Sequence, residues 1–459
     1  MERRGSWFSG VARAFALALL AGCGGGAAGA TTPTAATGTT HGEALPFIHD
    51  DFPKALAEAK RRNKPLFVDA WAPWCHSCQS LRAYVLTDPS LAPLSSAFVW
   101  LSVDTEKDVN AGWVARFPHE ALPTLWILDP ATERPLLKWA GTATAEELRA
   151  LLGVAVSDAG GAGSPQLEAT AAFVRGNQRL AAGDREGAEK EHRAALAAAG
   201  AGHPHRARIV EALVTGLSSR KEHERCAEVA ASDDASAAAG TSRASVLTVG
   251  LSCARAAKRT AELDRLLEAG VRDASARDAS LLPDDRAALY EEVVAAKKSR
   301  GDAAGARALA EAWAAYVEGE AAKARTADAR AALDPWRVSA ALELGQPERA
   351  IPALEASERD FPADYNPPAR LGRLYLELAR LDDADAAAAR AVARVYGPRA
   401  MRVHALRADI AKARGDRAGE ISALEEALKR SEGATLTDGQ RGVREGIAKR
   451  LEAARARAK

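Results

Sequence analysis

The hydrophobic pattern divides the chain into two regions of different character. Between residues 43 and 153, short apolar runs are mixed with helical patterns, and the runs at 66–71 and 98–103 suit buried strands. From residue 167 to the C-terminus, alanine and leucine recur at helical spacing in one segment after another. The pattern therefore predicts an α/β domain over 43–153, a Gly- and Ser-rich linker over 154–166, and an all-α region over 167–459.

Composition supports a mainly helical protein and excludes one class of function. Hydrophobic residues make up 47% of the chain but aromatic residues only 5%, which favours small side chains packed between helices over a β-sandwich. The 62 Lys and Arg residues nearly balance the 61 Asp and Glu residues, which leaves a net charge of +1. Because this balance offers no broad basic surface, we expect no nucleic-acid partner.

Short turns recur through the helical region and divide it into helix pairs. They begin at residues 183, 221, 259, 301, 345, 381 and 415, at successive intervals of 38, 38, 42, 44, 36 and 34 residues. A period of about 34 residues with paired helices is typical of tetratricopeptide repeats. The stretch 366–430 resembles that family best, through Gly372, Tyr375 and Ala386. The resemblance implies a solenoid of stacked helix pairs that binds a partner, and a helical array of no recognisable repeat class is the alternative.

The N-terminal residues are typical of an exported protein. Three arginines precede an apolar run at 14–21, which is far shorter than the ~20 residues of a membrane span, so residues 1–22 are predicted to be a signal peptide. The run ends in LAGC, which resembles the lipobox of bacterial lipoproteins. The resemblance implies that Cys23 carries a diacylglycerol group and begins a flexible tether over 23–42. We therefore expect a lipid anchor in the bacterial cell envelope, facing the periplasm, in the inner or the outer membrane; a plain signal peptide with a chance cysteine is the alternative.

Two cysteines stand at the start of a predicted helix, in the sequence WCHSC at residues 74–78. The strand at 66–71 leads through a turn into this helix. Unpaired backbone N–H groups and the positive end of the helix dipole lower the pKa of a thiol in such a position, so Cys75 is expected to be a partly exposed nucleophile. Cys78 lies on the same helix face, close enough to attack a mixed disulfide within the molecule. The pattern favours thiol–disulfide chemistry.

Other uses of the cysteine pair fit the sequence less well. A disulfide between residues three apart closes too small a loop to stabilise the fold much. A zinc site needs a second Cys or His pair at ligand spacing, and a c-type haem needs histidine where Gln79 stands. A copper site with Cys75, His76 and Cys78 lacks an evident further ligand. We therefore expect no metal and no cofactor.

Further motifs surround the cysteines, with Lys64-Pro65 before the strand and DPSL at residues 88–91 after the helix. Through these motifs, residues 51–152 resemble the thioredoxin family, and most closely the C-terminal domain of the thiol:disulfide interchange protein DsbD. The resemblance implies a thioredoxin-like fold in which Asp69 is a buried acid that takes a proton from the second cysteine. It also implies a cis proline, Pro123, that faces the cysteines, in a loop that presents its backbone to the substrate.

The sequence departs from the thioredoxin pattern at several positions. Gln79 replaces a common lysine after the second cysteine, and Trp100 stands where thioredoxin proper has a lysine paired with the buried acid. His76-Ser77 replaces the usual Gly-Pro between the cysteines. A protonated histidine beside the nucleophile stabilises its thiolate and the reduced form, which makes the pair more oxidising. The direction of electron flow therefore stays open.

Two further features of the helical region bear on stability and binding. Cys226 and Cys253 fall on helices that are expected to pack together, so a disulfide and two buried thiols are both compatible with the sequence. Arginines on the first helices of the pairs predict acidic or carboxylate-bearing partner segments, with solvated side chains as the alternative. These arginines are Arg206, Arg208, Arg243, Arg370, Arg373 and Arg402.

Together these features predict a membrane-tethered, extracytoplasmic thiol–disulfide oxidoreductase that acts on protein thiols and disulfides and exchanges electrons with a redox partner protein. The predicted catalytic residues are Cys75, Cys78 and Asp69. The predicted substrate-binding residues are Trp74, His76, Leu122, Pro123 and Thr124. The alternative is a non-catalytic scaffold or assembly lipoprotein that uses its repeats to bind proteins.

Overall fold

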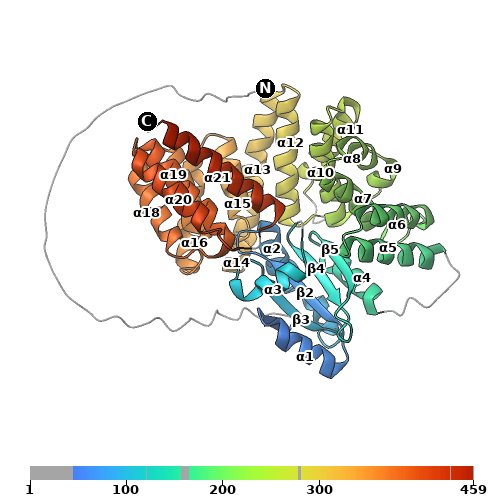
Figure 1. The fold of residues 1–459 in the computed structure, drawn as a ribbon. Helices are drawn as coiled ribbons and strands as arrows, with labels where there is room; N and C mark the ends of the chain where they lie inside the picture. Colours follow the sequence, from blue (N-terminus) through green and yellow to red (C-terminus); the bar gives the residue numbers. More distant parts are fainter. Residues whose placement is uncertain (1–44, 120, 157–164, 278–280, 435, 458–459) are drawn as a thin grey trace. The chain divides into compact units, whose positions relative to one another are not determined.

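A five-stranded sheet lies at the centre of the α/β region in the computed structural model (Figure 1), which describes residues 45–457 except 120, 157–164, 278–280 and 435. The strand order is β1-β3-β2-β4-β5. The first three of these strands are parallel, and β4 is antiparallel to both its neighbours. The strands are β1 (Phe47–His49), β2 (Leu66–Trp71), β3 (Val99–Asp104), β4 (Thr124–Leu128) and β5 (Pro135–Ala140).

Helices cover both faces of this sheet, which explains why its central strands are continuous apolar runs rather than alternating patterns. On one face, α1 (Phe52–Arg62) and α3 (Ala111–Arg116) pack their apolar side chains against the sheet. On the other face lie α2 (His76–Ser80), the π-helical turn η1 (Leu81–Val85) and α4 (Ala145–Val156). The predicted α/β architecture is confirmed.

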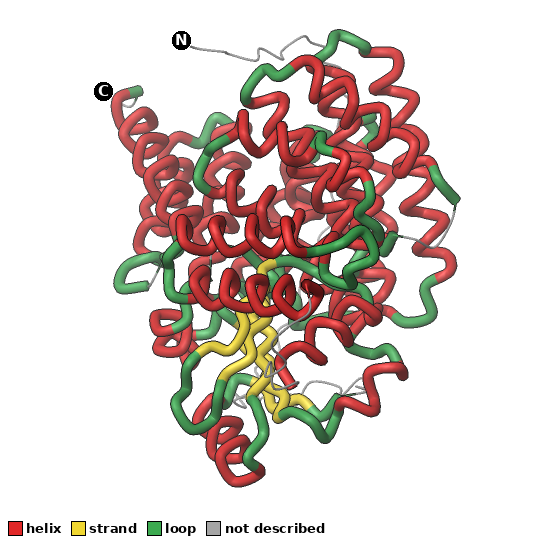
Figure 2. The backbone as a smooth tube through the Cα atoms, turned by 90° about the vertical axis from the view of Figure 1, so that its right-hand side faces the viewer, coloured by secondary structure: helices red, strands yellow, loops and turns green. Residues whose placement is uncertain are grey.

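The rest of the described chain is helical, and Figure 2 shows the strands gathered in one sheet with helices elsewhere. Successive helices pack as antiparallel pairs, and the last helix packs against the final pair. The pairs are α5 (Pro165–Ala181) with α6 (Arg185–Ala198), α7 (Arg206–Ser219) with α8 (His223–Ala230), α10 (Gly240–Ala256) with α11 (Thr260–Ser275), α12 (Pro283–Ser299) with α13 (Ala303–Lys323), α17 (Asn366–Glu377) with α18 (Leu381–Val392), and α19 (Ala400–Ala413) with α20 (Arg417–Lys429). Between them, α15 (Asp334–Glu343) packs against the 3-10 turn η4 (Pro347–Ala350), which runs directly into α16 (Ile351–Asp360). Further helices are α9 (Asp233–Ser236), α14 (Ala327–Ala331) and α21 (Asp438–Ala456).

Six of the seven predicted turns begin between two successive helices, and the seventh begins at the first residue of α18. Each of these seven junctions contains one residue with left-handed backbone conformation, which ends the first helix. The residues are Gly183, Lys221, Lys258, Gly301, Gly345, Ala379 and Gly415. In three of the turns an aspartate then caps the second helix, because its carboxylate accepts a bond from the backbone N–H three residues later. The predicted series of paired helices is confirmed.

The α/β region and the helical region share a hydrophobic core, and Gly42–Lys459 forms one compact unit. Trp139 on β5 packs edge-on against Phe173 on α5, with ring centroids 6.1 Å apart. Ile209 and Leu213 on α7 belong to the same buried cluster. The helical region is therefore packed against the α/β region rather than joined to it only through a linker.

Several sequence predictions stay untested by this structure. The predicted signal peptide (1–22) and tether (23–42), including Cys23, lie outside the described residues. The domain limits 43–153, 154–166 and 167–459 also stay predictions. Among the residues that are described, no helix combines the length and the apolar character needed to cross a bilayer.

Candidate active site

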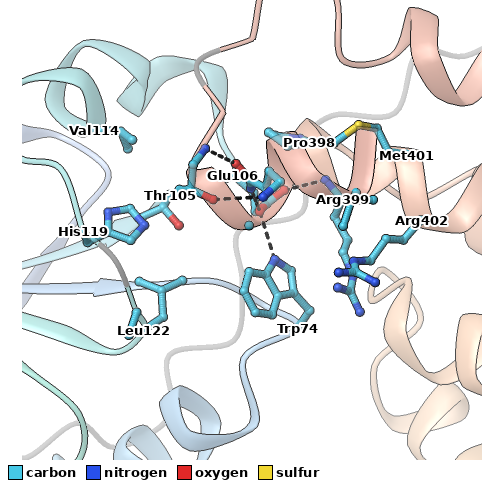
Figure 3. Close-up of a pocket in the computed structure, with 15 residues that line it drawn as sticks. Trp74, Thr105, Glu106, Val114, His119, Leu122, Pro398, Arg399, Met401 and Arg402 are labelled. Carbon is cyan, nitrogen blue, oxygen red and sulfur yellow. Dashed lines mark hydrogen bonds between the residues drawn. The ribbon is translucent and has the colours of Figure 1, made fainter. Parts of the chain in front are cut away.

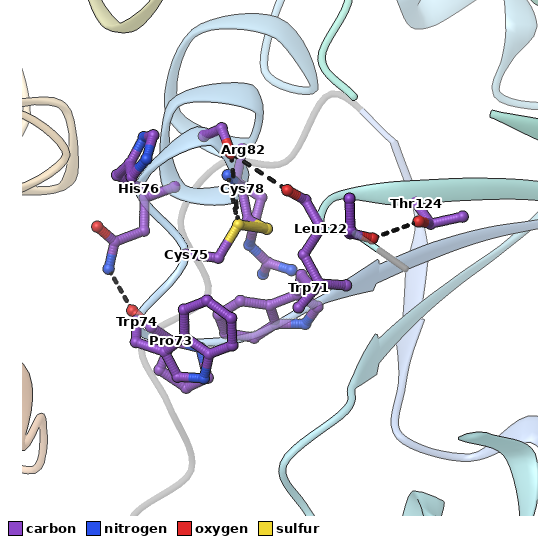
Figure 4. Close-up of a disulfide and its surroundings, with 12 residues drawn as sticks. Trp71, Pro73, Trp74, Cys75, His76, Cys78, Arg82, Leu122 and Thr124 are labelled. Atoms are coloured by element: carbon purple, nitrogen blue, oxygen red, sulfur yellow. Dashed lines mark hydrogen bonds between the residues drawn. A yellow bond between two sulfur atoms is a disulfide. The ribbon is translucent and has the colours of Figure 1, made fainter. Parts of the chain in front are cut away.

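The two cysteines of the motif form a disulfide at the N-terminus of α2 (Figure 4). Cys75 is the N-cap residue, and its Sγ accepts a hydrogen bond from the backbone N–H of Cys78 over 3.1 Å. β2, the central strand, ends at Trp71, so the turn that follows places the first cysteine beyond the carboxyl end of this strand. A thiolate at Cys75 would therefore have a backbone donor already aimed at it.

The loop before β4 faces the disulfide. The Leu122–Pro123 peptide bond is cis, as the resemblance implied. Leu122 packs against the cluster formed by Ala72 and the two cysteines, and its carbonyl oxygen accepts a hydrogen bond from Ser77 Oγ at 3.4 Å. The structure thus brings the cysteine pair and this loop together, as Figure 4 shows.

The position of Thr124 differs from that of a substrate-facing residue. Its side chain is buried at the start of β4, and its Oγ1 donates to the carbonyl oxygen of Ala121 at 2.6 Å. The hydroxyl therefore holds the loop in shape. The predicted substrate-binding role of Thr124 therefore rests on its backbone and not on its side chain.

The exposure of Cys75 differs from the prediction. The sequence predicts a partly exposed nucleophile, but Cys75 is only 4% exposed and Cys78 is fully buried. The physical reason is the helical region, which packs against the motif: Asn366 on α17 donates to the carbonyl oxygen of Pro73 at 3.1 Å. Cys75 nevertheless is the more accessible of the two sulfur-bearing residues.

Asp69 lies on β2 beneath the motif, fully buried. Its Oδ2 is 3.4 Å from Nη1 of Arg82, which also donates to Ser102 Oγ at 2.7 Å. The Arg82 guanidinium lies 4.2 Å from the centre of the Trp71 ring. A cation thus reaches the buried acid from the helix that follows the cysteines, and not from the position that Trp100 occupies.

Arg82 is a residue that sequence reasoning missed, although a signal was present. It follows Cys78 by four positions, which places it one helical turn further on the same face. Trp100 instead fills the core, where it packs against Phe67 with ring centroids 4.8 Å apart. The missing lysine therefore does not leave Asp69 without a cationic neighbour.

His76 points away from the sulfurs and toward the helical region. Its Nδ1 is 3.0 Å from Oδ1 of Asp284 on α12, and its ring lies edge-on to Trp336, with centroids 4.5 Å apart. Asp284 Oδ1 also accepts from Trp336 Nε1 at 2.6 Å. Burial by itself would lower the pKa of His76, but the charge of Asp284 and the hydrogen bond to it outweigh burial and raise that pKa. The sequence did not indicate this partner, which lies 208 residues away.

Trp74 connects the motif to a second buried carboxyl group. Its Nε1 donates to Glu106 Oε1 at 2.9 Å. Burial raises the pKa of Glu106, although hydrogen bonds from Trp74 and from the backbone N–H of Arg399 oppose the shift. Figure 3 shows this contact at the wall of a cavity that both regions line.

The second pair of cysteines is also joined. Cys226 on α8 and Cys253 on α10 form a disulfide with Cα atoms 6.0 Å apart. Of the two possibilities that the sequence left open, the structure has the bonded one. Within the described part of the chain, no group of three or more His, Cys, Asp or Glu side chains is arranged to hold a metal ion.

Comparison with known proteins agrees with the α/β fold and its site. Residues 48–130 match the family model described as thioredoxin-like, so this part of the chain is a thioredoxin-like domain. The chain is similar to the thiol:disulfide interchange protein DsbD of Pseudoalteromonas atlantica, with 30% identity over 82 residues, which are 17% of this chain and 14% of that protein. The match therefore covers only a small part of the relative.

Two solved structures are also similar to part of this chain. A tetratricopeptide repeat protein from Parabacteroides merdae has 13% identity and a TM-score of 0.39, over 62% of this chain and 98% of that one. BtubC from P. vanneervenii has 17% identity and a TM-score of 0.32, over 50% of this chain and 94% of that one.

Proposed function

We propose that this protein is a thiol–disulfide oxidoreductase that acts on protein disulfides. The observation that carries the proposal is the Cys75–Cys78 disulfide at a helix N-terminus, opposite the cis Leu122–Pro123 bond. Asp69 lies buried beneath the pair, where it is suited to accept the proton of Cys78. A domain that only binds proteins needs none of these features in combination.

The proposed reaction exchanges two electrons between the cysteine pair and a substrate. In the reducing direction, the Cys75 thiolate attacks one sulfur of a substrate disulfide, forming a mixed disulfide and releasing one substrate thiolate. Cys78 then loses its proton and attacks Cys75 Sγ, so that the Cys75–Cys78 bond forms and the second substrate thiolate leaves. Two electrons pass from the cysteine pair to the substrate. The two released substrate thiolates take up the proton that Cys78 loses and one proton from solvent, which replaces the proton that Cys75 gave up when it ionised. The oxidising direction reverses these steps and starts from the disulfide seen here.

Turnover of a model protein disulfide tests this proposal on the full chain. Cys75→Ser should abolish turnover, and Cys78→Ser should accumulate mixed disulfides because the resolving step is lost. The matched control is the double variant Cys226→Ser/Cys253→Ser, which removes the other cysteine pair and should keep the activity. Full activity in Cys75→Ser would refute its role as nucleophile. Absence of turnover in the unmodified protein would favour the scaffold alternative.

The proposal places the protein outside the cytoplasm on a lipid anchor at Cys23. The lipobox-like LAGC sequence supports the anchor. The Cys226–Cys253 disulfide supports an oxidising compartment, because stable disulfides seldom persist in the cytosol. Mass spectrometry of the mature N-terminus from membrane fractions should find an acylated Cys23, and Cys23→Ser should leave an unprocessed precursor. An unmodified Cys23 in that fraction would contradict the anchor.

The helical region is proposed to bind substrate or redox partner proteins. Its packing against the cysteine motif supports this role, because a partner held there lies beside the reacting sulfur. Mixed disulfides trapped by full-length Cys78→Ser, identified by mass spectrometry, would name these partners. Trapping that is unaffected by surface substitutions in the helical region would argue against such selection.

A further inference from the structure

A cavity of about 250 Å³ lies beside the cysteine motif, slightly below the ~300 Å³ at which typical ligand sites begin. Trp74, Leu122 and Glu106 line it from the thioredoxin-like domain, and Arg399 and Arg402 line it from the start of α19. Trp74 and Leu122 also pack against the cluster that contains Cys75 and Cys78. The cavity therefore shares two of its walls with the surroundings of the disulfide.

The acidic residue of the cavity is already engaged by hydrogen-bond donors. Glu106 Oε1 accepts from Trp74 Nε1 at 2.9 Å and from Gln440 Nε2 at 3.2 Å. Glu106 Oε2 accepts from the backbone N–H of Arg399 at 2.7 Å. These bonds hold the two regions together at this point, and they leave the carboxylate little capacity to pair with a guanidinium as well.

The two arginines of the cavity differ from Glu106 in this respect. Figure 3 shows Arg399 and Arg402 next to each other, on the same side of Trp74. The Arg399 guanidinium lies 5.2 Å from the centre of the Trp74 ring. Burial lowers the pKa of Arg399 to about 10, although the charges of Tyr365 and Glu106 oppose the shift. Arg399 therefore stays protonated at neutral pH. The cavity is thus lined by two cations and by the Glu106 carboxylate, which already accepts hydrogen bonds from other groups.

Of the six arginines that the sequence placed on first helices, four form ion pairs within the chain, and Arg370 and Arg402 form none with the described residues. Arg206, Arg208, Arg243 and Arg373 form ion pairs with acidic side chains of the chain itself. Arg402 is exposed, and no described acidic side chain forms an ion pair with it. Arg402 therefore contributes a positive charge without an ion-pair partner to the cavity beside the cysteine motif.

We propose that this cavity binds the carboxylate of an acidic residue close in sequence to the reacting cysteine of a substrate polypeptide. Arg402 makes the direct contact, and Arg399 supplies the second positive charge. A planar guanidinium matches a carboxylate through paired hydrogen bonds, which are stronger than bonds between neutral groups. The inference rests on the proposed function and adds a preference among its substrates.

The test uses the full-length oxidised protein and dithiol peptides that differ at one residue. The first peptide has Glu beside one cysteine, the second has Gln at that place, and both have an amidated C-terminus. The third peptide has Gln at that place and a free C-terminal carboxylate. During a single turnover each peptide loses two electrons and two protons to the Cys75–Cys78 disulfide, and chromatography measures its oxidation. We expect the Glu peptide to react about tenfold faster than the Gln peptide. A comparable gain for the third peptide would identify a chain terminus as the source of the carboxylate.

Substitution of Arg402 should remove this preference, measured as the ratio of the rates of the Glu and Gln peptides. Arg402→Gln should bring the ratio of the Glu and Gln rates close to one, and Arg402→Glu should favour a matched Lys peptide. The control is Arg407→Gln, an exposed position on α19 outside the cavity lining that changes the net charge equally. An unchanged ratio in Arg402→Gln, or an equal loss in both variants, would overturn the proposal. Equal rates for all peptides with the unmodified protein would overturn it while leaving the proposed function intact, and no oxidation of any peptide would overturn both.

Discussion

The carboxyl group of Asp285 should make the stability of this protein depend on pH in a measurable way. Asp285 lies at the start of α12, where Oδ2 accepts from Thr241 Oγ1 at 2.8 Å and Oδ1 accepts from Thr142 Oγ1 at 3.3 Å. Thr142 follows β5, so this carboxyl joins the thioredoxin-like domain to the helical region. Burial, and then the charge of Asp284, raise the pKa of Asp285 from 3.8 to about 7.

The sign and size of the effect follow from proton binding. A carboxyl with a raised pKa binds its proton more tightly in the folded state than in the unfolded state. The resulting stabilisation is complete below pH 3.8 and is lost as the pH rises through about 7. Each pH unit in this window changes the free energy of unfolding by about 1.4 kcal/mol. Between pH 5 and pH 8 the loss therefore amounts to about 2.7 kcal/mol, nearly all of it below pH 7.

Urea unfolding of the unmodified protein and of Asp285→Asn isolates this contribution. Circular dichroism at pH 5, 6, 7 and 8 gives the free energy of unfolding of each protein, and all other titrating groups are common to both. The difference between the two proteins should change by about 2.7 kcal/mol across this range, in favour of Asp285→Asn at high pH. Stability curves that run parallel from pH 5 to pH 8 would refute the reasoning.

Three other substitutions test separate parts of the structure. Cys226→Ser opens a disulfide between residues 27 apart and should lower the free energy of urea unfolding by about 3.5 kcal/mol if loop entropy dominates; a loss below ~1 kcal/mol would contradict this. Arg82→Gln removes the cation beside buried Asp69 and should cost about 1–3 kcal/mol in the same assay, so an unchanged midpoint would argue against the pairing. Gly397→Ala places a Cβ against the Glu106 carbonyl oxygen, so hydrogen exchange should rise in α19 but not in α5, and uniform exchange would contradict a local contact.

The fold was largely predictable because its strongest signals are local. The run at 66–71 matches β2, and the run at 98–103 begins and ends one residue earlier than β3. The predicted turns succeed because glycine or a capping aspartate marks most of them in the sequence. β1 was not predicted, since a three-residue edge strand contains too few positions to show a pattern.

The candidate site was predictable only where its residues are close in sequence. A stretch of only ten positions of the sequence contains Cys75, Cys78 and Asp69, and the loop before β4, which contains the cis peptide bond, has a sequence motif of its own. Asp284 and Arg399 were missed because they reach the motif through packing of segments more than two hundred residues away. The exposure of Cys75 was misjudged for the same reason, since sequence reasoning treated the α/β region as standing alone.

The contacts between the helical region and the cysteine motif also have a thermodynamic consequence. His76, Pro73 and Glu106 all bond to residues outside the thioredoxin-like domain, and each lies in the cysteine motif or contacts it. If the helices of the helical region pack more favourably against the disulfide state than against the dithiol state, reciprocity requires that the same free energy shift the reduction potential of the cysteine pair. A tenfold preference corresponds to about 30 mV for a two-electron couple. Such a preference would make the midpoint potential a property of the whole compact unit, and a partner that pulls the helices away from the motif would then change that potential.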